Sequence, residues 1–154
     1  TSANYESMAA NAQRRASLSG ESEATPAVMD ISAITPSMMG KIEFDTWEDS
    51  DDIRVMDDII GEAVRGIGAD LPDQAWATDL LKAVEEGKEI SIDPAAPAEA
   101  TLSTISVPES VSAGAATFAK NSSASALLSA IQFALEYWFR AGRIRKHGNE
   151  YASL

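Results

Sequence analysis

Apolar residues recur every three or four positions in two stretches of the first hundred residues. Across residues 53–67 they follow the i, i+3, i+4 spacing of one helix face. Residues 72–86 repeat this pattern, with Pro72 suited to a first helical turn and Gly87 suited to a helix end. The pattern predicts two amphipathic helices, followed by a short edge strand at residues 88–93. The second helix is expected to bury Trp76, Leu80, Leu81 and Val84.

A different order of elements follows the linker PAAPAE at residues 94–99. Residues 100–107 (ATLSTISV) alternate in polarity and are rich in β-branched residues, which predicts a strand. Residues 109–120 then have the pattern of a helix. A longer amphipathic helix is expected to begin at a serine cap within residues 122–125 and to end by Gly148.

Charge divides the chain at the same place. Residues 1–100 contain 7 Lys+Arg and 21 Asp+Glu, a net charge of −14, whereas residues 101–154 contain 5 and 3, a net charge of +2. Residues 1–42 lack a sustained period, apart from a possible short helix at 9–18, and are expected to be a flexible arm that orders on a partner. Residues 43–93 are expected to form a small acidic helical domain.

This acidic portion predicts a basic protein partner. Phosphate contact needs Lys and Arg, which are outnumbered here, so the whole chain is not expected to bind nucleic acid non-specifically. Aromatic side chains lie within the acidic run EFDTWEDSDD at residues 43–52. The residues expected to contact the partner are Phe44, Trp47, Asp49, Asp51 and Asp52.

No group of side chains in the sequence is typical of an enzyme. The run at residues 43–52 lacks the ligand spacing and glycine of an EF-hand loop, and it fits a solvated acidic face or a mimic of nucleic-acid charge. Gly66 and Gly68 lack the strand, third glycine and lysine of a phosphate loop, and fit a helix stop. His147, the only histidine, lies at a basic helix end. We expect no catalytic residue, no cofactor and no metal.

Cysteine content and hydropathy limit the setting of the protein. The chain has no cysteine, which excludes disulfide scaffolds and thiolate metal sites. No apolar run approaches the roughly 18–20 residues that span a bilayer, and the N-terminus lacks the pattern of a signal peptide. We expect no membrane partner and a cytoplasmic location.

The last predicted helix carries an aromatic triple and a basic cluster. Tyr137, Trp138 and Phe139 are consecutive and cannot all point to one side of a helix, so burial of at least one in an oligomer is expected. Three roles fit the basic cluster from Arg140 to Lys146. It could contact DNA phosphate, form a solvated helix end, or pair with the acidic arm of another copy.

The order of strand, helix, serine-rich turn and longer helix in residues 100–145 resembles the ribbon-helix-helix family, and within it the ParD-like antitoxins. The segment Ile105–Val111 (ISVPESV) resembles the strand end and helix start of that family. Ser123–Ser125 and Tyr137–Ile144 (YWFRAGRI) resemble its second helix. The fold class expected is therefore mainly α, with the acidic helical domain followed by a ribbon-helix-helix module at 100–147 and a tail at 148–154.

The resemblance implies a homodimer that binds DNA. In that family two chains pair their strands antiparallel, and the ribbon lies in the major groove. A lone strand has unpaired edges and needs a copy of itself. The residues implied to face bases are Leu102, Thr104 and Ser106, two short hydroxyls and a leucine where family strands usually carry Arg, Lys, Asn or Gln. The residues expected to contact phosphate are Ser123, Ser125, Arg140 and Arg143. The expected oligomer interface is Ile105, Val107, Leu128, Ile131, Leu135 and Trp138.

Two functions of different classes follow. The first is a DNA-binding regulator of antitoxin type, a homodimer whose acidic region binds a basic protein such as a toxin. The alternative is a structural or assembly protein of a virus particle or large complex, with an N-terminal arm that threads over neighbouring subunits. Duplex binding that weakens steeply with salt would favour the first.

Overall fold

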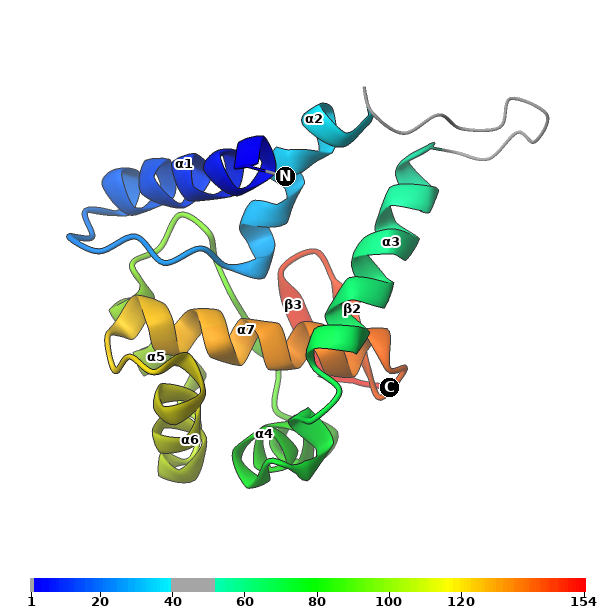
Figure 1. Ribbon diagram of the computed structural model, residues 1–154. Helices are drawn as coiled ribbons and strands as arrows, with labels where there is room; N and C mark the ends of the chain where they lie inside the picture. The colour runs from blue at the N-terminus through cyan, green and yellow to red at the C-terminus, as the bar shows by residue number, and fades with distance from the viewer. Residues whose placement is uncertain (1, 40–51) are drawn as a thin grey trace.

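The computed structural model describes residues 2–39 and 52–154, and it is mainly helical with a small three-stranded sheet near the C-terminus (Figure 1). The α-helices are α1 (Ser2–Ser19), α2 (Thr35–Met39), α3 (Asp52–Ile67), α4 (Ala75–Glu85), α5 (Ala98–Ile105), α6 (Glu109–Ala119) and α7 (Ala124–Arg140). Two 3₁₀ helices, η1 (Val28–Ile34) and η2 (Leu71–Asp73), precede α2 and α4. The strands are β1 (Ile90–Ser91), β2 (Ile144–His147) and β3 (Glu150–Ser153).

Helix α7 runs through the middle of the molecule, and elements from both ends of the chain pack against it (Figure 1). Its expected serine cap is confirmed, because the Ser123 Oγ accepts a hydrogen bond from the Ala126 backbone N–H at 3.3 Å. Buried side chains lie on several faces of the helix, as is typical of a helix enclosed by others. They include Ala126, Leu128, Ala130, Ile131, Ala134, Leu135 and Trp138.

The strand expected at residues 100–107 is wrong, because residues 98–105 form helix α5. Ala98, Thr101 and Ile105 are buried and share one helical face, so the segment also fits a helical period. Its hydroxyl side chains bond to carbonyls one turn back, as Thr101 Oγ1 does to Pro97 O at 3.2 Å. The helix ends at Ser106, which has a φ of +44°. The ribbon-helix-helix module is therefore not confirmed.

The expected end of the last helix and the expected tail are also wrong. Helix α7 stops at Arg140, and Gly142, with a φ of +70°, turns the chain into the hairpin of β2 and β3. Strand β3 is the middle strand of the order β1-β3-β2, and Ile90 of β1 pairs with Tyr151. The edge strand expected near residues 88–93 is thus present as β1, with a partner more than fifty residues away.

One hydrophobic core extends across the segment 94–99, so the linker and domain boundary expected there are wrong. It contains residues from α4 and β1, such as Trp76 and Ile90, together with residues from α5, α6, α7 and the hairpin. The helices expected at 53–67, 72–86 and 109–120 are confirmed as α3, η2 with α4, and α6. The four apolar residues expected to be buried in the second helix are buried in α4.

Residues 2–39 fold back onto their own chain, in place of the expected flexible arm. The fully buried Asp30 of η1 holds this segment together. Its carboxylate accepts hydrogen bonds from Asn11 Nδ2 at 2.9 Å, from Arg15 at 3.0 Å and from the backbone N–H of Ala27 at 2.9 Å. Helix α1 and η1 are therefore joined by a buried ion pair, and η1 rests on α7.

Candidate functional site

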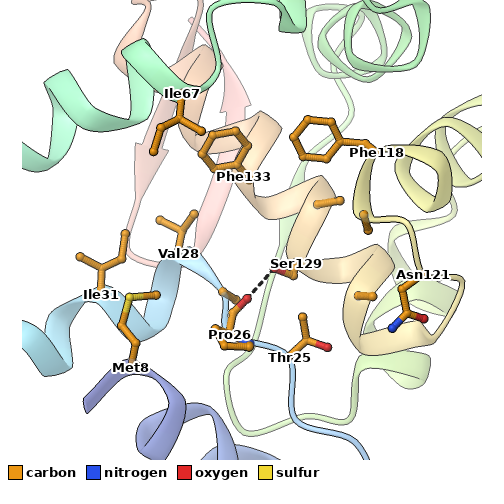
Figure 2. A pocket seen from close by; sticks show the side chains of 14 residues that line it. Met8, Thr25, Pro26, Val28, Ile31, Ile67, Phe118, Asn121, Ser129 and Phe133 are labelled. Atoms are coloured by element: carbon orange, nitrogen blue, oxygen red, sulfur yellow. Dashed lines mark hydrogen bonds between the residues drawn. The ribbon is translucent and has the colours of Figure 1, made fainter. Parts of the chain in front are cut away.

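An apolar groove of about 550 Å³ lies where α1, η1, α3, α6 and α7 meet (Figure 2). Met8, Val28 and Ile31 stand on one side, and Ile67 and Phe118 stand across from them. None of the fourteen lining residues is charged. The remaining lining residues are Thr25, Pro26, Ala27, Ala119, Asn121, Ala126, Ser129, Ala130 and Phe133.

The floor of the groove is formed by small residues of α7, which leave space above the helix. Ala126, Ser129 and Ala130 line it from successive turns, and Phe133 follows one turn later. The Phe133 ring stacks on Phe118, with ring centroids 6.1 Å apart and planes 17° apart. Aromatic packing therefore fixes the boundary between floor and wall.

The wall formed by α6 is supported by α4, which packs against it. Phe118 lines the groove and is 38% exposed, yet its ring also contacts Trp76 of α4 at a centroid distance of 5.5 Å. Helices α4 and α6 lie unusually close, because a Cβ on Gly114 would overlap the Trp76 side chain. Phe118 is therefore an exposed aromatic residue on a rigid support.

The C-terminal end of α3 forms another part of the same side of the groove. Ile67 is 72% exposed, although it is a large apolar residue beside other apolar side chains. The glycine that follows it, Gly68, allows the chain to approach α7 closely, because a Cβ there would overlap the Tyr137 ring. This close approach brings Ile67 to the rim of the groove.

The three polar side chains in the lining are already hydrogen-bonded within the chain. Ser129 Oγ donates to Pro26 O at 2.8 Å. Thr25 Oγ1 shares a hydrogen bond of 2.9 Å with Ser125 Oγ. Asn121 Nδ2 donates to the exposed Glu23 carboxylate at 3.0 Å, and Asn121 Oδ1 accepts from the Ser123 backbone N–H. The groove therefore offers contact with apolar surface and places a carboxylate at one end.

Helix α3 is fastened to α7 by a charge network near its middle. Both guanidinium NH groups of Arg140 donate to the Asp57 carboxylate at 2.6 Å, and its Nε donates to Glu136 at 2.9 Å. The hydrogen bond from Arg140 lowers the pKa of Asp57 against the opposing effect of burial. The hydrogen bond to Asp57 likewise raises the pKa of Arg140.

Glu136 is the buried centre of this network, with 1% exposure. Its other oxygen accepts from Lys146 Nζ at 2.7 Å and from Tyr151 OH at 2.9 Å. Burial alone would raise the pKa of Glu136, but the hydrogen bonds and charge of Lys146, with the hydrogen bonds of Arg140 and Tyr151, lower it. Burial, followed by the charge of Glu136, raises the pKa of Tyr151. The network ties α7 to both α3 and the hairpin, and all of its charges have partners.

The residues expected to face DNA bases do not form a reading face. Leu102 packs partly buried against the core on α5. Thr104 is exposed, and its hydroxyl donates to the Ala100 carbonyl at 3.0 Å. Ser106 caps the helix, and its carbonyl accepts a hydrogen bond from Lys88. Because the segment is helical, these three side chains do not alternate along a ribbon.

The residues expected to contact phosphate are engaged with acceptors of their own chain. Ser123 Oγ donates to Glu23 at 2.9 Å, and Ser125 pairs with Thr25. Arg140 is held by Asp57 and Glu136, and Arg143 donates to Glu85 at 2.7 Å. Carboxylates and hydroxyls of the same chain thus lie where phosphate oxygens were expected.

The residues expected at an oligomer interface are used inside one chain. Ile105, Leu128, Ile131, Leu135 and Trp138 are buried in the core, and Val107 packs against it. The aromatic triple is accommodated in the same way, because Trp138 Nε1 donates to Ala77 O at 3.1 Å while Tyr137 and Phe139 pack partly buried. The α4, α7 and hairpin contacts supply the burial that a second subunit was expected to supply.

The expected partner-binding residues are mostly outside the described part of the chain. Phe44, Trp47, Asp49 and Asp51 fall in residues 40–51, and Asp52 is the first residue of α3. The groove itself was missed, and only the apolar character of Ile67 and Phe118 hinted at it in the sequence. Residues from five separate elements form it, and no local pattern reports their meeting.

Residues 2–39 and 52–154 contain neither a metal-binding cluster nor a membrane-spanning helix. No group of three His, Cys, Asp or Glu side chains is arranged there to hold a metal ion. None of the helices in these ranges has the length and apolar character needed to cross a bilayer. Comparison with protein-family models, with curated proteins and with solved structures found no match. The groove is therefore the feature on which we base a functional argument.

Proposed function

We propose that this chain is a protein-binding module whose groove accepts an apolar segment of a basic protein partner. One observation carries the proposal: large apolar side chains, Ile67 above all, remain exposed around an open concave surface that contains no charged lining residue. A volume near 550 Å³ lies in the range of about 300–1,000 Å³ that is typical of binding pockets. A concave and mostly apolar surface is the usual form of a binding site in proteins.

The charge of the surroundings supports a basic partner. Residues 1–100, which supply both the α1–η1 side and the α3 side of the groove, carry a net charge of −14. Such a surface attracts cationic partners and repels a second acidic surface. The partner is thus the basic protein expected from the sequence, and its apolar segment contacts the groove and not the run at residues 43–52.

The two functions expected from the sequence fare differently under this proposal. A binding module fits an assembly protein of a large complex, because its apolar groove is suited to holding a neighbouring chain. DNA binding by a regulator of antitoxin type stays a prediction. It has no support from residues 98–105, which are helical, or from Arg140, which is paired with carboxylates.

A pair of matched substitutions tests the proposal. Ile67→Ser removes an exposed isoleucine from the groove, whereas Leu18→Ser removes a leucine of similar exposure, 75%, that does not line it. The probes are two designed peptides with the same leucine positions, one carrying lysine and the other glutamate. Loss of one apolar anchor is expected to weaken binding of the lysine peptide about 10-fold, and Leu18→Ser is expected to leave it unchanged.

Fluorescence anisotropy of labelled peptides measures these affinities. The proposal predicts that the glutamate peptide binds far more weakly than the lysine peptide to the wild-type chain. If Ile67→Ser and Leu18→Ser bind the lysine peptide as tightly as the wild type, attraction is purely electrostatic and the groove is not the binding site. Far-ultraviolet circular dichroism confirms that both variants are folded.

A further inference from the structure

We infer that the occupant of the groove is an amphipathic α-helix with lysine or arginine on its flanks, and not an extended peptide. This inference rests on the proposed function and specifies the partner segment. It follows from three properties of the site: the bonds that its three polar side chains already make within the chain, the absence of a bordering strand, and the placement of its carboxylates.

The first property is the hydrogen-bonding capacity of the lining. Each polar side chain of the lining already makes a hydrogen bond within the chain. Thr25 bonds to Ser125, Asn121 to Glu23, and Ser129 to the Pro26 carbonyl. An extended peptide that enters this surface would bury backbone N–H and C=O groups without partners, which costs free energy for each group. A helix satisfies these groups within itself and presents only side chains.

The second property is the position of the sheet. Extended peptides bind commonly by adding a strand to an exposed sheet edge. Among the described residues, the strands are β1, β2 and β3, and none of their residues lines the groove. The groove is bordered by helices and by the segment 25–27, so no sheet edge is presented to an incoming strand.

The sizes of the lining side chains agree with the apolar face of a helix as the occupant. Ala126 and Ala130, four residues apart on α7, leave room above the floor, and the larger Phe133 follows one turn later. Larger side chains form the two walls, with Ile31 on one side and Ile67 on the other (Figure 2). An apolar stripe with anchors at i, i+3 or i+4, and i+7 fits between such walls.

The third property is charge at the borders. Exposed Glu23 is bonded to Asn121 at one end of the groove. Exposed Asp70 lies three residues beyond Ile67, and exposed Glu6 lies two residues before Met8. The lining itself is uncharged, and the cations nearest to it in sequence are exposed Lys120, beside Asn121, and Arg65, which is paired with Glu62. The three carboxylates therefore outnumber the one of these cations that is unpaired within the described residues, in line with the net charge of −14 of residues 1–100. A helix with an apolar face and basic flanks matches this division of apolar and acidic surface.

The experiment compares three peptides that contain leucine and lysine and differ in the conformation that they favour. One places leucine and lysine at helical spacing with helix-stabilising residues. The second alternates leucine and lysine as in a strand, and the third is the helical sequence with two central prolines. Each is titrated into the wild-type chain, Ile67→Ser and Leu18→Ser. The helical peptide is expected to bind the wild type about 10-fold more tightly than the other two, with a loss in Ile67→Ser only.

The outcomes distinguish whether the groove binds a partner segment from whether that segment is helical. If the alternating or proline peptide binds as tightly as the helical one, and Ile67→Ser weakens that binding, the groove is a binding site but the helical inference is wrong. If no peptide responds to Ile67→Ser, the proposed function is wrong and the inference falls with it. Added salt provides a second readout, because loss of affinity with salt is expected for cationic flanks.

Discussion

Replacement of the buried Glu136 by glutamine tests the charge network that joins α3, α7 and the hairpin. In the folded chain this carboxylate accepts from Arg140 Nε at 2.9 Å, from Lys146 Nζ at 2.7 Å and from Tyr151 OH at 2.9 Å. Glutamine has nearly the same shape, but one of its two terminal groups is a donor. Glu136→Gln therefore removes the negative charge and turns an NH₂ group toward at least one of these donors.

The expected loss of stability follows from these contacts. A hydrogen bond to a charged group contributes about 1.5–3 kcal/mol, and removal of one partner from a buried ion pair costs about 3–5 kcal/mol. The side chains of Lys146 and Arg140 keep 27% and 15% exposure, so water compensates part of the loss. We expect the free energy of unfolding to fall by about 2–4 kcal/mol. The melting temperature is then expected to fall by roughly 5–15 °C.

The pH dependence gives a second, independent readout. The pKa of Glu136 is lowered from its ordinary value of 4.5, because Lys146, Arg140 and Tyr151 together outweigh the effect of burial. A carboxyl with a lowered folded pKa takes up a proton on unfolding. Its contribution is complete above its unfolded pKa and is lost as the pH falls through its folded pKa. The stability difference between wild type and Glu136→Gln should therefore be largest near neutral pH and shrink in acid.

Urea unfolding followed by tryptophan fluorescence, at neutral pH and at several acidic pH values, measures both effects. Glu89→Gln is the matched control, because Glu89 is an exposed carboxylate and its replacement should change stability little. If Glu136→Gln is as stable as Glu89→Gln, or if its deficit is the same at every pH, the network does not stabilise the fold as argued.

Three further predictions concern single contacts. Gly114→Ala should lower the free energy of unfolding by about 1–3 kcal/mol in urea titrations, because the added Cβ overlaps Trp76; wild-type stability would contradict this close packing. Asp57→Asn removes the charge of the acceptor of Arg140 and should speed amide hydrogen exchange in α3 more than in α4. If α3 exchanges at the same rate in Asp57→Asn and in the wild type, the ion pair does not hold α3 against α7. Lys120→Gly should raise the melting temperature, because Lys120 has a φ of +52°, a conformation that costs an L-residue about 1 kcal/mol; a lower melting temperature would count against this.

Several helices could be predicted from local pattern. The apolar periods at residues 53–67, 72–86 and 109–120 mark helices that are present, and the serine cap of α7 is present at Ser123. These elements satisfy their backbone hydrogen bonds among residues four positions apart, so the information that specifies them is nearby in the chain.

Other elements depended on partners that the sequence does not display. Residues 98–105 fit a strand by composition and a helix by spacing, and burial of Ala98, Thr101 and Ile105 in the shared core decided for the helix. Strand β3 exists because Ile90 and Ile144 lie on strands that pair with it from both sides. A strand needs such remote neighbours for its hydrogen bonds.

The sequence by itself determined that this chain is mainly helical, acidic in its first hundred residues and without cysteine. Only the tertiary structure decided which face is left open for a partner. Ile67 and Phe118 are ordinary apolar residues of amphipathic helices, and they line one groove only because α3 and α6 both pack on α7. A helix is specified by contacts within a few residues, whereas a groove is the space left between elements after all of them have packed.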